Sequence, residues 1–304
     1  MRPVFELNRV VKRFRRQVAL DDVTFNGKSG SIVALLGENG AGKTTALKIL
    51  LGLAEADSGR AEVFGLDSRT QGQEIRRRVG YVPEHPIMYD WMSVAEAGWF
   101  AAGFYGQGYL QRYRELVARF RLDESKKLKA LSKGMRAKVA LSTAMAHEPE
   151  LLVLDEPTSG LDAIVRREFL ESMVHVAGEG RTVLLSSHQI AEVERVADVV
   201  AILREGKLVV FERLDDLKNE VRELTITLRN GAPHAPDVPG SIISQRQKNR
   251  QWRVLVRDVN DELLGIVRDD ELVGHVDVKS PSLEDIFVGY MRPDATEPEE
   301  ADQQ

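Results

Sequence analysis

The chain has 304 residues and a net charge of −5. It contains no cysteine, which excludes disulfides and thiolate chemistry. Its apolar fraction of 43% and charged fraction of 29% are those of a globular protein with one large domain or two smaller ones. The acidic balance does not favour nucleic-acid binding, so no nucleic-acid partner is expected. Because we find no apolar signal-peptide core and no apolar run of about 18 residues, we expect the chain to stay in the cytosol.

Residues 4–36 are predicted to form strands and turns that lead to a phosphate-binding pattern. The apolar run at 31–36 is typical of a buried strand, and apolar residues at helical spacing over 45–51 predict a helix. Between them lies a G-x-x-x-x-G-K-T sequence made of Gly37, Glu38, Asn39, Gly40, Ala41, Gly42, Lys43 and Thr44. This order of strand, glycine loop and helix indicates a P-loop, the alternative being a chance glycine-rich turn.

The residue types of this loop predict its chemistry. Glycines allow backbone N–H groups to close around phosphate oxygens, and the N-terminus of the following helix adds a partial positive charge. We expect Lys43 to reach the β- and γ-phosphates of a nucleotide, and the Thr44 hydroxyl to bind Mg²⁺. Earlier in the chain, an exposed Phe14 would be able to stack on a base, the alternative being a core phenylalanine.

A helical block is predicted over about 93–147, between the P-loop and the next buried strand. It opens with Ser93-Val94-Ala95-Glu96, which is an S-x-x-E capping box. Further helices are expected over 113–120 and 134–146, and the block contains no heptad array.

Two later strands are predicted to be buried and to end in polar side chains. The apolar run 151–154 leads to Asp155 and Glu156, and the run 182–187 leads to His188. Since carboxyl ends of parallel strands meet at one edge of a sheet, these side chains should lie together. We expect Asp155 to hold Mg²⁺ and Glu156 to polarise an attacking water, the alternative being a solvated acidic loop. His188 is expected to contact the γ-phosphate, although a lone histidine is more often structural.

The composition changes near residue 216. We expect residues 1–216 to form one domain and 217–292 a small α+β domain, with strands at 224–228 and 254–256. Helices are predicted over 261–268 and after Ser282, which starts an S-x-x-D cap, and residues 230–240 should form a loop. The acidic, polar residues 293–304 are expected to be a disordered tail.

Taken together, the segments GENGAGKTT at 37–45, LLVLDEPTSGLD at 151–162 and SSH at 186–188 resemble the ATP-binding subunit of an ABC transporter. The resemblance covers about residues 4–215. It implies an α/β P-loop NTPase fold of ABC type, with an inserted helical subdomain and an N-terminal antiparallel β subdomain. It also implies an ATPase that binds ATP and Mg²⁺ and closes as a head-to-tail dimer. Each ATP would then lie between the P-loop of one chain and the signature of its partner.

The resemblance assigns further nucleotide-binding residues. Thr45 belongs to the P-loop, Phe14 resembles the aromatic residue that stacks on adenine, and Asp162 resembles the D-loop residue at the dimer interface. The family signature corresponds to 131–135, in which Ser132, Gly134 and Met135 would face the nucleotide of the partner. Two departures are present. Glu84 stands where the family usually has a glutamine that contacts Mg²⁺, and Lys133 and Met135 replace glycine and glutamine in the signature.

The YVPE, LSKGM and 281–287 segments are similar to those of bacterial ABC-2-type exporters. This similarity implies a polytopic membrane permease on a separate chain, a homodimer or heterodimer of ATPase subunits, export, and a location at the inner face of the cell membrane. The alternatives are a non-transport ABC ATPase of the translation-associated or DNA-repair type, and a ligand-sensing ATP-binding module. Only one P-loop is present, and 88 positions without heptads separate Thr44 from Ser132.

Overall fold

The computed structural model describes residues 2–15, 17–229 and 237–292. The expected tail at 293–304 and most of the expected loop at 230–240 therefore lie outside the described residues. The chain divides into two compact units, Met1–Phe211 and Glu212–Gln304. The division falls inside strand β10 (Lys207–Arg213), a few residues before the boundary expected from the sequence.

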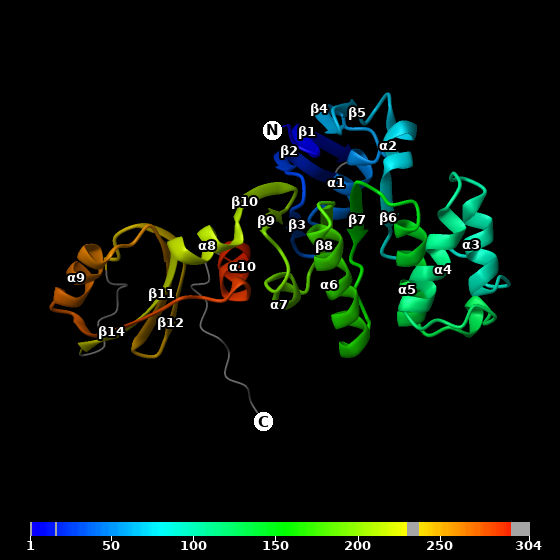
Figure 1. Ribbon diagram of the computed structural model, residues 1–304. Helices are drawn as coiled ribbons and strands as arrows, with labels where there is room; N and C mark the ends of the chain where they lie inside the picture. Colours follow the sequence, from blue (N-terminus) through cyan, green and yellow to red (C-terminus); the bar gives the residue numbers. More distant parts are fainter. Residues whose placement is uncertain (1, 16, 230–236, 293–304) are drawn as a thin grey trace. The chain divides into compact units, whose positions relative to one another are not determined.

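The first unit begins with an antiparallel sheet of order β2-β1-β4-β5 (Figure 1). Its strands are β1 (Phe5–Phe14), β2 (Gln17–Gly27), β4 (Ser58–Val63) and β5 (Leu66–Asp67). Phe5, Leu7 and Val10 of β1 are buried, while the charged residues between them are not, as expected for a strand with one covered face. The predicted N-terminal antiparallel subdomain is confirmed.

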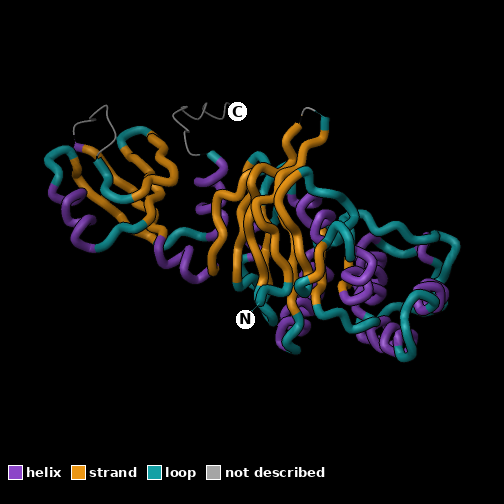
Figure 2. The backbone as a smooth tube through the Cα atoms, turned by 90° about the horizontal axis from the view of Figure 1, so that it is seen from above, coloured by secondary structure: helices purple, strands orange, loops and turns teal. Residues whose placement is uncertain are grey.

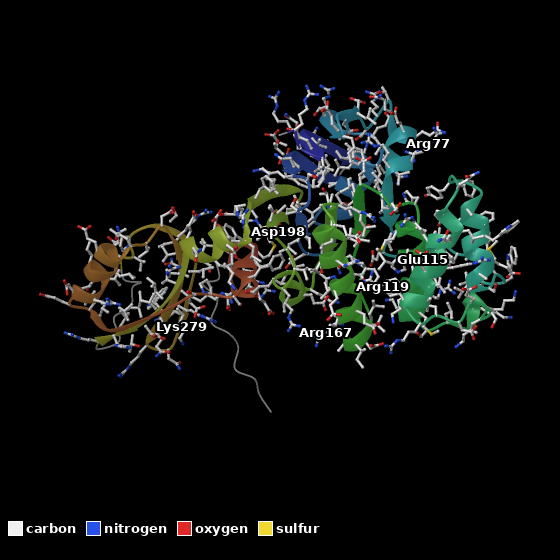
Figure 3. The ribbon with its side chains drawn as sticks, viewed as in Figure 1. Arg77, Glu115, Arg119, Arg167, Asp198 and Lys279 are labelled. Carbon is white, nitrogen blue, oxygen red and sulfur yellow. The ribbon has the colours of Figure 1, made fainter. Side chains whose placement is uncertain are left out.

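The centre of the first unit is a six-stranded sheet of order β10-β9-β3-β8-β7-β6. Its remaining strands are β3 (Ile32–Leu36), β6 (Val79–Val82), β7 (Leu151–Asp155), β8 (Thr182–Ser187) and β9 (Val199–Arg204). Every residue of β3, β7 and β8 is buried, which explains why these segments are continuously apolar rather than alternating. Asp198, labelled in Figure 3, accepts a hydrogen bond of 2.8 Å from the backbone N–H of Ile32 at the start of β3.

Seven α-helices accompany this sheet within the described residues of the first unit: α1 (Lys43–Leu50), α2 (Gly72–Arg78), α3 (Val94–Ala102), α4 (Tyr109–Arg119), α5 (Lys133–Met145), α6 (Ala163–Gly178) and α7 (Ile190–Val193). A short 3₁₀-helix, Leu128–Ala130, precedes α5. Helices α3, α4 and α5 gather in the predicted helical subdomain (Figure 1).

In the helical subdomain, the start of α3 is determined by local sequence and the start of α4 by packing against another helix. The predicted capping box forms, because Ser93 N donates to Glu96 Oε2 (2.6 Å) and Glu96 N donates to Ser93 Oγ (3.1 Å). Helix α4 begins one turn earlier than expected. Its first residue, Tyr109, is buried and donates its hydroxyl to Thr143 O of α5 (2.9 Å), so tertiary packing extends the helix.

The second unit is the predicted α+β domain, with an antiparallel sheet of order β12-β13-β11-β14. Its elements are α8 (Leu214–Glu220), β11 (Val221–Leu228), β12 (Ser241–Lys248), β13 (Gln251–Arg257), α9 (Asp261–Asp269), β14 (Val273–Lys279) and α10 (Leu283–Met291). Strands and helices of this unit are distinguished by colour in Figure 2. One face of the sheet packs on α9 through Ile226, Trp252, Val254 and Leu264.

The second predicted cap gives a test of local stability. Ser282 Oγ accepts a hydrogen bond from Asp285 N (3.1 Å), and Ser282 N donates to Asp285 Oδ2 (3.2 Å). We expect Ser282→Ala to lower the free energy of unfolding of the second unit by about 1 kcal/mol, the usual effect of losing an N-cap. Urea unfolding followed by Trp252 fluorescence, in a chain with Trp91 and Trp99 replaced by Phe, measures it. The exposed Ser280 provides the control Ser280→Ala, and equal effects of the two changes would contradict the prediction.

Candidate nucleotide-binding site

The register of the parallel strands brings the predicted residues to one edge of the central sheet. Leu36 at the end of β3 pairs with Ser187 of β8, and Asp155 at the end of β7 pairs with Ser186. Val82 at the end of β6 pairs with Leu154. The P-loop, His188, the Asp155-Glu156 pair and the segment containing Glu84 therefore all leave the sheet at this edge.

The loop between β3 and α1 has the geometry that a phosphate requires. Gly42, with a φ of 107°, is the N-cap of α1, and a Cβ atom there would come within 2.3 Å of Ala19 O. No side chain caps the helix and no acidic residue lies in its first turn. The first N–H groups of a helix have no partner within the helix. The N–H groups of Lys43, Thr44 and Thr45 are thus available to phosphate oxygens, so the loop fits the group that its sequence predicts.

Lys43 lies inside the loop and is only 6% exposed. Its ammonium donates to Gly37 O (2.7 Å) and Glu38 O (3.2 Å), and it forms an ion pair with Glu156 Oε1 at 3.0 Å. A buried ammonium needs such compensation because leaving water is costly for a charged group. The structure therefore joins the P-loop lysine directly to one of the two predicted carboxylates.

The second carboxylate oxygen of Glu156 binds His188. Glu156 Oε2 accepts a hydrogen bond from His188 N (3.2 Å) and lies 2.6 Å from His188 Nδ1. Glu156 is 8% exposed and has a φ of 48°, a left-handed conformation that is strained for a residue with a side chain. Strain of this kind often accompanies functional positions. Lys43, Glu156 and His188 thus form one continuous chain of charged and polar contacts.

Ser186 connects the two carboxylates and was not among the predicted site residues. Its hydroxyl donates to Asp155 Oδ1 (2.6 Å) and accepts from Glu156 N (3.0 Å), and the side chain is fully buried. The signal in the sequence is the polar end of an otherwise apolar strand. Burial raises the pKa of the neighbouring Tyr81 to about 12, and the negative charge of Asp155 adds to this effect.

The metal ligands predicted from the sequence lie at the same edge but form no preformed cage. Among the described residues, no group of three His, Asp or Glu side chains is arranged to hold a metal ion. Mg²⁺ commonly takes one or two protein ligands and completes its shell with water and phosphate oxygens, and Thr44 and Asp155 fit that mode. The Glu84 carboxylate is half exposed and lies 3.9 Å from His85 Nδ1.

Ser132, Gly134 and Met135 of the signature lie at the N-terminus of α5. Ser132 is the N-cap, and its hydroxyl accepts from Met135 N (3.2 Å). Gly134 is buried, and a Cβ atom there would come within 3.0 Å of Val165 Cγ1 on α6. Lys133 Nζ lies 2.5 Å from the position that a Cβ atom of Gly160 would take, so the lysine lies against the D-loop.

Two other predicted residues lie on the surface. Asp162 is the N-cap of α6 and accepts from Ile164 N (3.1 Å) and Val165 N (3.0 Å). Phe14 is 51% exposed, with Lys12 Nζ 5.3 Å from the centre of its ring. It is therefore not a core phenylalanine, and about half of its side chain is accessible.

Residues 20–159 match the ABC transporter family, and residues 213–291 match the C-terminal domain of DrrA1-3-like ATP-binding proteins. The ABC transporter ATP-binding protein sll0415 of Synechocystis sp. is 31% identical over 274 residues, which cover 87% of this chain and 76% of that protein. The bacitracin transport ATP-binding protein BcrA of Bacillus licheniformis is 35% identical over 229 residues, which cover 73% and 74% of the two chains.

A solved structure of the ATP-binding subunit of an ABC transporter is 35% identical, with a TM-score of 0.66 over 71% of this chain and 92% of its own. The chain belongs to the ATP-binding subunits of ABC transporters. This ABC subunit is an ATPase that binds ATP and works with a membrane permease, and the predicted fold class is confirmed. Within the described residues, no helix combines the length and the apolar character that a membrane span requires.

The buried contact of Lys43 with Glu156 gives a prediction for catalysis. We expect Lys43→Ala to abolish ATP hydrolysis, because it removes the phosphate-binding ammonium and leaves Glu156 without its cation. Steady-state phosphate release measures the loss, and circular dichroism shows whether the variant is folded. Lys48→Ala, an exposed lysine on the same helix, is the matched control and should hydrolyse ATP normally. Near-normal turnover of a folded Lys43→Ala chain would contradict the assignment.

Proposed function

We propose that the ABC subunit is an exporter motor that hydrolyses Mg-ATP as a head-to-tail dimer and drives a permease on a separate chain. The observation that carries this proposal is the separation of the site into two clusters on each chain. One cluster contains the P-loop, Glu156 and His188, and the other contains Ser132, Lys133 and the D-loop. The D-loop is joined to Glu156, because Ser159 N donates to Glu156 O (3.2 Å), but no hydrogen bond or ion pair in the described chain joins Ser132 or Lys133 to the P-loop, Glu156 or His188. A head-to-tail partner would bring its Ser132 and Lys133 to the nucleotide on that P-loop.

Within one chain, the roles follow from the contacts. The P-loop N–H groups and Lys43 would bind the phosphates, Phe14 would stack on the base, and Thr44 and Asp155 would hold Mg²⁺, with Glu84 as a further ligand. The bound ion would neutralise charge on the phosphate oxygens. Lys43 would exchange its contact with Glu156 for phosphate oxygens, which frees one carboxylate oxygen of Glu156 to accept a proton from the attacking water. His188 would keep that carboxylate in place through Oε2.

The second cluster would complete the site of the partner. Ser132 and the N–H groups of the first turn of α5 would face the γ-phosphate, while Gly134 allows close packing of α5 against Val165 of α6. Met135 would line the same approach, and Asp162 would lie at the interface. Helices between α1 and α5 in the described chain are at most eleven residues long, so nothing favours the coiled-coil insertion of a DNA-repair ATPase.

An exposed aromatic patch supports docking of a separate permease. The patch comprises Tyr89, Trp91, Phe100 and Phe104, and its ring centres are 5.6 to 5.9 Å apart. Trp91 is 64% and Phe104 74% exposed. Monomeric proteins rarely expose large apolar patches unless they bind a partner. Phe100 and Phe104 lie in and just after α3, and Tyr89 and Trp91 belong to the segment that follows Glu84. A cytoplasmic segment of the permease bound to the patch would therefore contact residues of that segment that are only a few positions from Glu84 in the sequence. Such docking would hold the subunit at the inner face of the membrane.

Export is supported by the YVPE and LSKGM segments and by the match of the second unit to the DrrA1-3-like C-terminal domain. The relative BcrA is named for bacitracin transport. The direction is tested by reconstituting the subunit with its permease in vesicles. Accumulation of substrate on the side opposite the ATP supports export, and movement toward the ATP side would contradict it.

Dimer closure gives a prediction in which one residue of each cluster, Glu156 and Ser132, is changed in turn. We expect Glu156→Gln to bind Mg-ATP and to shift from monomer to dimer in sedimentation, because the water-polarising charge is lost while the shape is kept. Adding Ser132→Arg to the same chain should reverse the shift by crowding the partner's γ-phosphate, without weakening ATP binding to the monomer. Ser125→Arg, on an exposed loop, is the control. A Glu156→Gln chain that binds ATP and remains a monomer would contradict homodimeric closure. A heterodimer with a different ATPase subunit would then be the remaining form of the proposed dimer.

The aromatic patch gives a prediction for assembly. We expect Trp91→Ala combined with Phe104→Ala to reduce the amount of subunit that co-purifies with permease-containing membranes, because both rings would be buried on docking. Leu272→Ala, an exposed apolar residue of the second unit, is the control. Unchanged co-purification of the double variant would exclude the patch as the docking surface.

A further inference from the structure

The second unit contains a cavity that lies outside the ATP site. It has a volume of about 210 Å³ and is bounded by α10 and by the face of strands β11, β12 and β13 opposite the apolar core. The strand register places Ser244 opposite Leu255 and Arg246 opposite Arg253. Since opposed residues share one face of a sheet, all four side chains point to the side of α10, and they line the cavity.

The two arginines of the cavity differ in their partners. Arg253 forms ion pairs with Glu223 Oε2 (2.7 Å) and Asp285 Oδ1 (3.4 Å), and the hydrogen bond to Glu223 is the main cause of its raised pKa. Arg246 forms no ion pair with any residue in the described part of the chain, and its buried Nη2 has no hydrogen-bond acceptor there.

This arrangement leaves a buried hydrogen-bond donor of Arg246 without an acceptor in the described chain. Like charges directly opposite one another destabilise an antiparallel pair, and a buried donor without an acceptor costs free energy. Arg253 is paired with Glu223 and Asp285, so Arg246 is the guanidinium of the cavity that has no carboxylate of the described chain in contact and keeps a buried donor without an acceptor there. The Ser244 hydroxyl, on a side chain that is only 9% exposed, adds a second donor that has no partner in the described chain. Both donors line the cavity.

We propose that this cavity binds a small monocarboxylate, whose carboxylate accepts hydrogen bonds from Arg246 and Ser244 and whose apolar body lies against Leu255 and Val288. A dry apolar cavity of about 150 Å³ holds benzene, so a volume of about 210 Å³ suits roughly six to nine non-hydrogen atoms. The cavity lining also contains three carboxylates, those of Glu223, Glu284 and Asp285. Together with the two guanidinium groups they give the lining one net negative charge, which disfavours polyanions such as phosphates and nucleotides.

Calorimetric titration of the full chain tests the proposal. Butyrate and benzoate are the ligands, butyramide and benzamide are their neutral analogues of the same shape, and inorganic phosphate is the polyanion. We expect the carboxylates to bind at least about tenfold more tightly than the amides, as a charge-assisted hydrogen bond predicts. Arg246→Gln should remove that preference. Arg250→Gln, on the exposed β12–β13 turn, is the matched control and should keep it.

A second measurement separates binding from a structural role of Arg246. Without carboxylate, Arg246→Gln should raise the unfolding midpoint of the second unit, because it removes the repulsion from the opposed Arg253 and a buried donor without an acceptor. Added butyrate should raise the midpoint of the natural chain but not that of the variant. The proposal is overturned if neither carboxylate binds, if amides bind as tightly as carboxylates, if phosphate binds more tightly, or if Arg246→Gln binds carboxylates normally.

Discussion

The buried ion pair between Lys43 and Glu156 constrains the rest of the ATPase unit. Two ions that are almost wholly withdrawn from water stabilise a fold only when their geometry is good and their other oxygens and protons are bonded. Here the remaining Glu156 oxygen contacts His188, and the remaining lysine donors meet carbonyls of the P-loop. The contacting residues lie just after the strands β3, β7 and β8, so the contacts form only when these three strands keep their register. A slip of one residue would turn each polar strand end to the wrong face.

The same network explains how a strained residue is tolerated. The left-handed backbone of Glu156 is fixed by its N–H, which donates to Ser186 Oγ, and by both of its carboxylate oxygens. A nucleotide that takes Lys43 away from Glu156 changes one member of this network and leaves the others in place. The carboxylate is thereby coupled to phosphate binding, which places its activation after the arrival of ATP in the proposed reaction.

Much of this architecture could be predicted because its signals are local. The P-loop, the apolar strands with polar ends and the two capping boxes each occupy fewer than ten consecutive residues, and the fold class follows from their order. The pairing of Lys43 with Glu156 and the bridge through Ser186 could not be predicted, because both depend on which strands lie side by side. The early start of α4 at Tyr109 likewise depends on a contact with α5. The role of Glu84 stays a prediction, since its contacts in one chain are those of an exposed side chain.

Two cations that form no ion pair within the described residues lie in different settings, Lys133 on an exposed helix turn and Arg246 in the cavity of the second unit. Lys133 occupies the first turn of α5, where the helix dipole disfavours a positive charge, and its ammonium lies against the Gly160 backbone rather than a carboxylate. In the proposed dimer, the triphosphate bound by the partner would attract this ammonium, so the replacement of glycine by lysine would favour closure on a charged nucleotide; a lysine that points to solvent would have no such effect. Arg246 belongs to a cavity that is lined by residues of the second unit. The Lys133 ammonium is solvated in a single chain, whereas Arg246 keeps a buried donor without an acceptor in the described chain, so Arg246 alone of the two indicates a ligand within one chain.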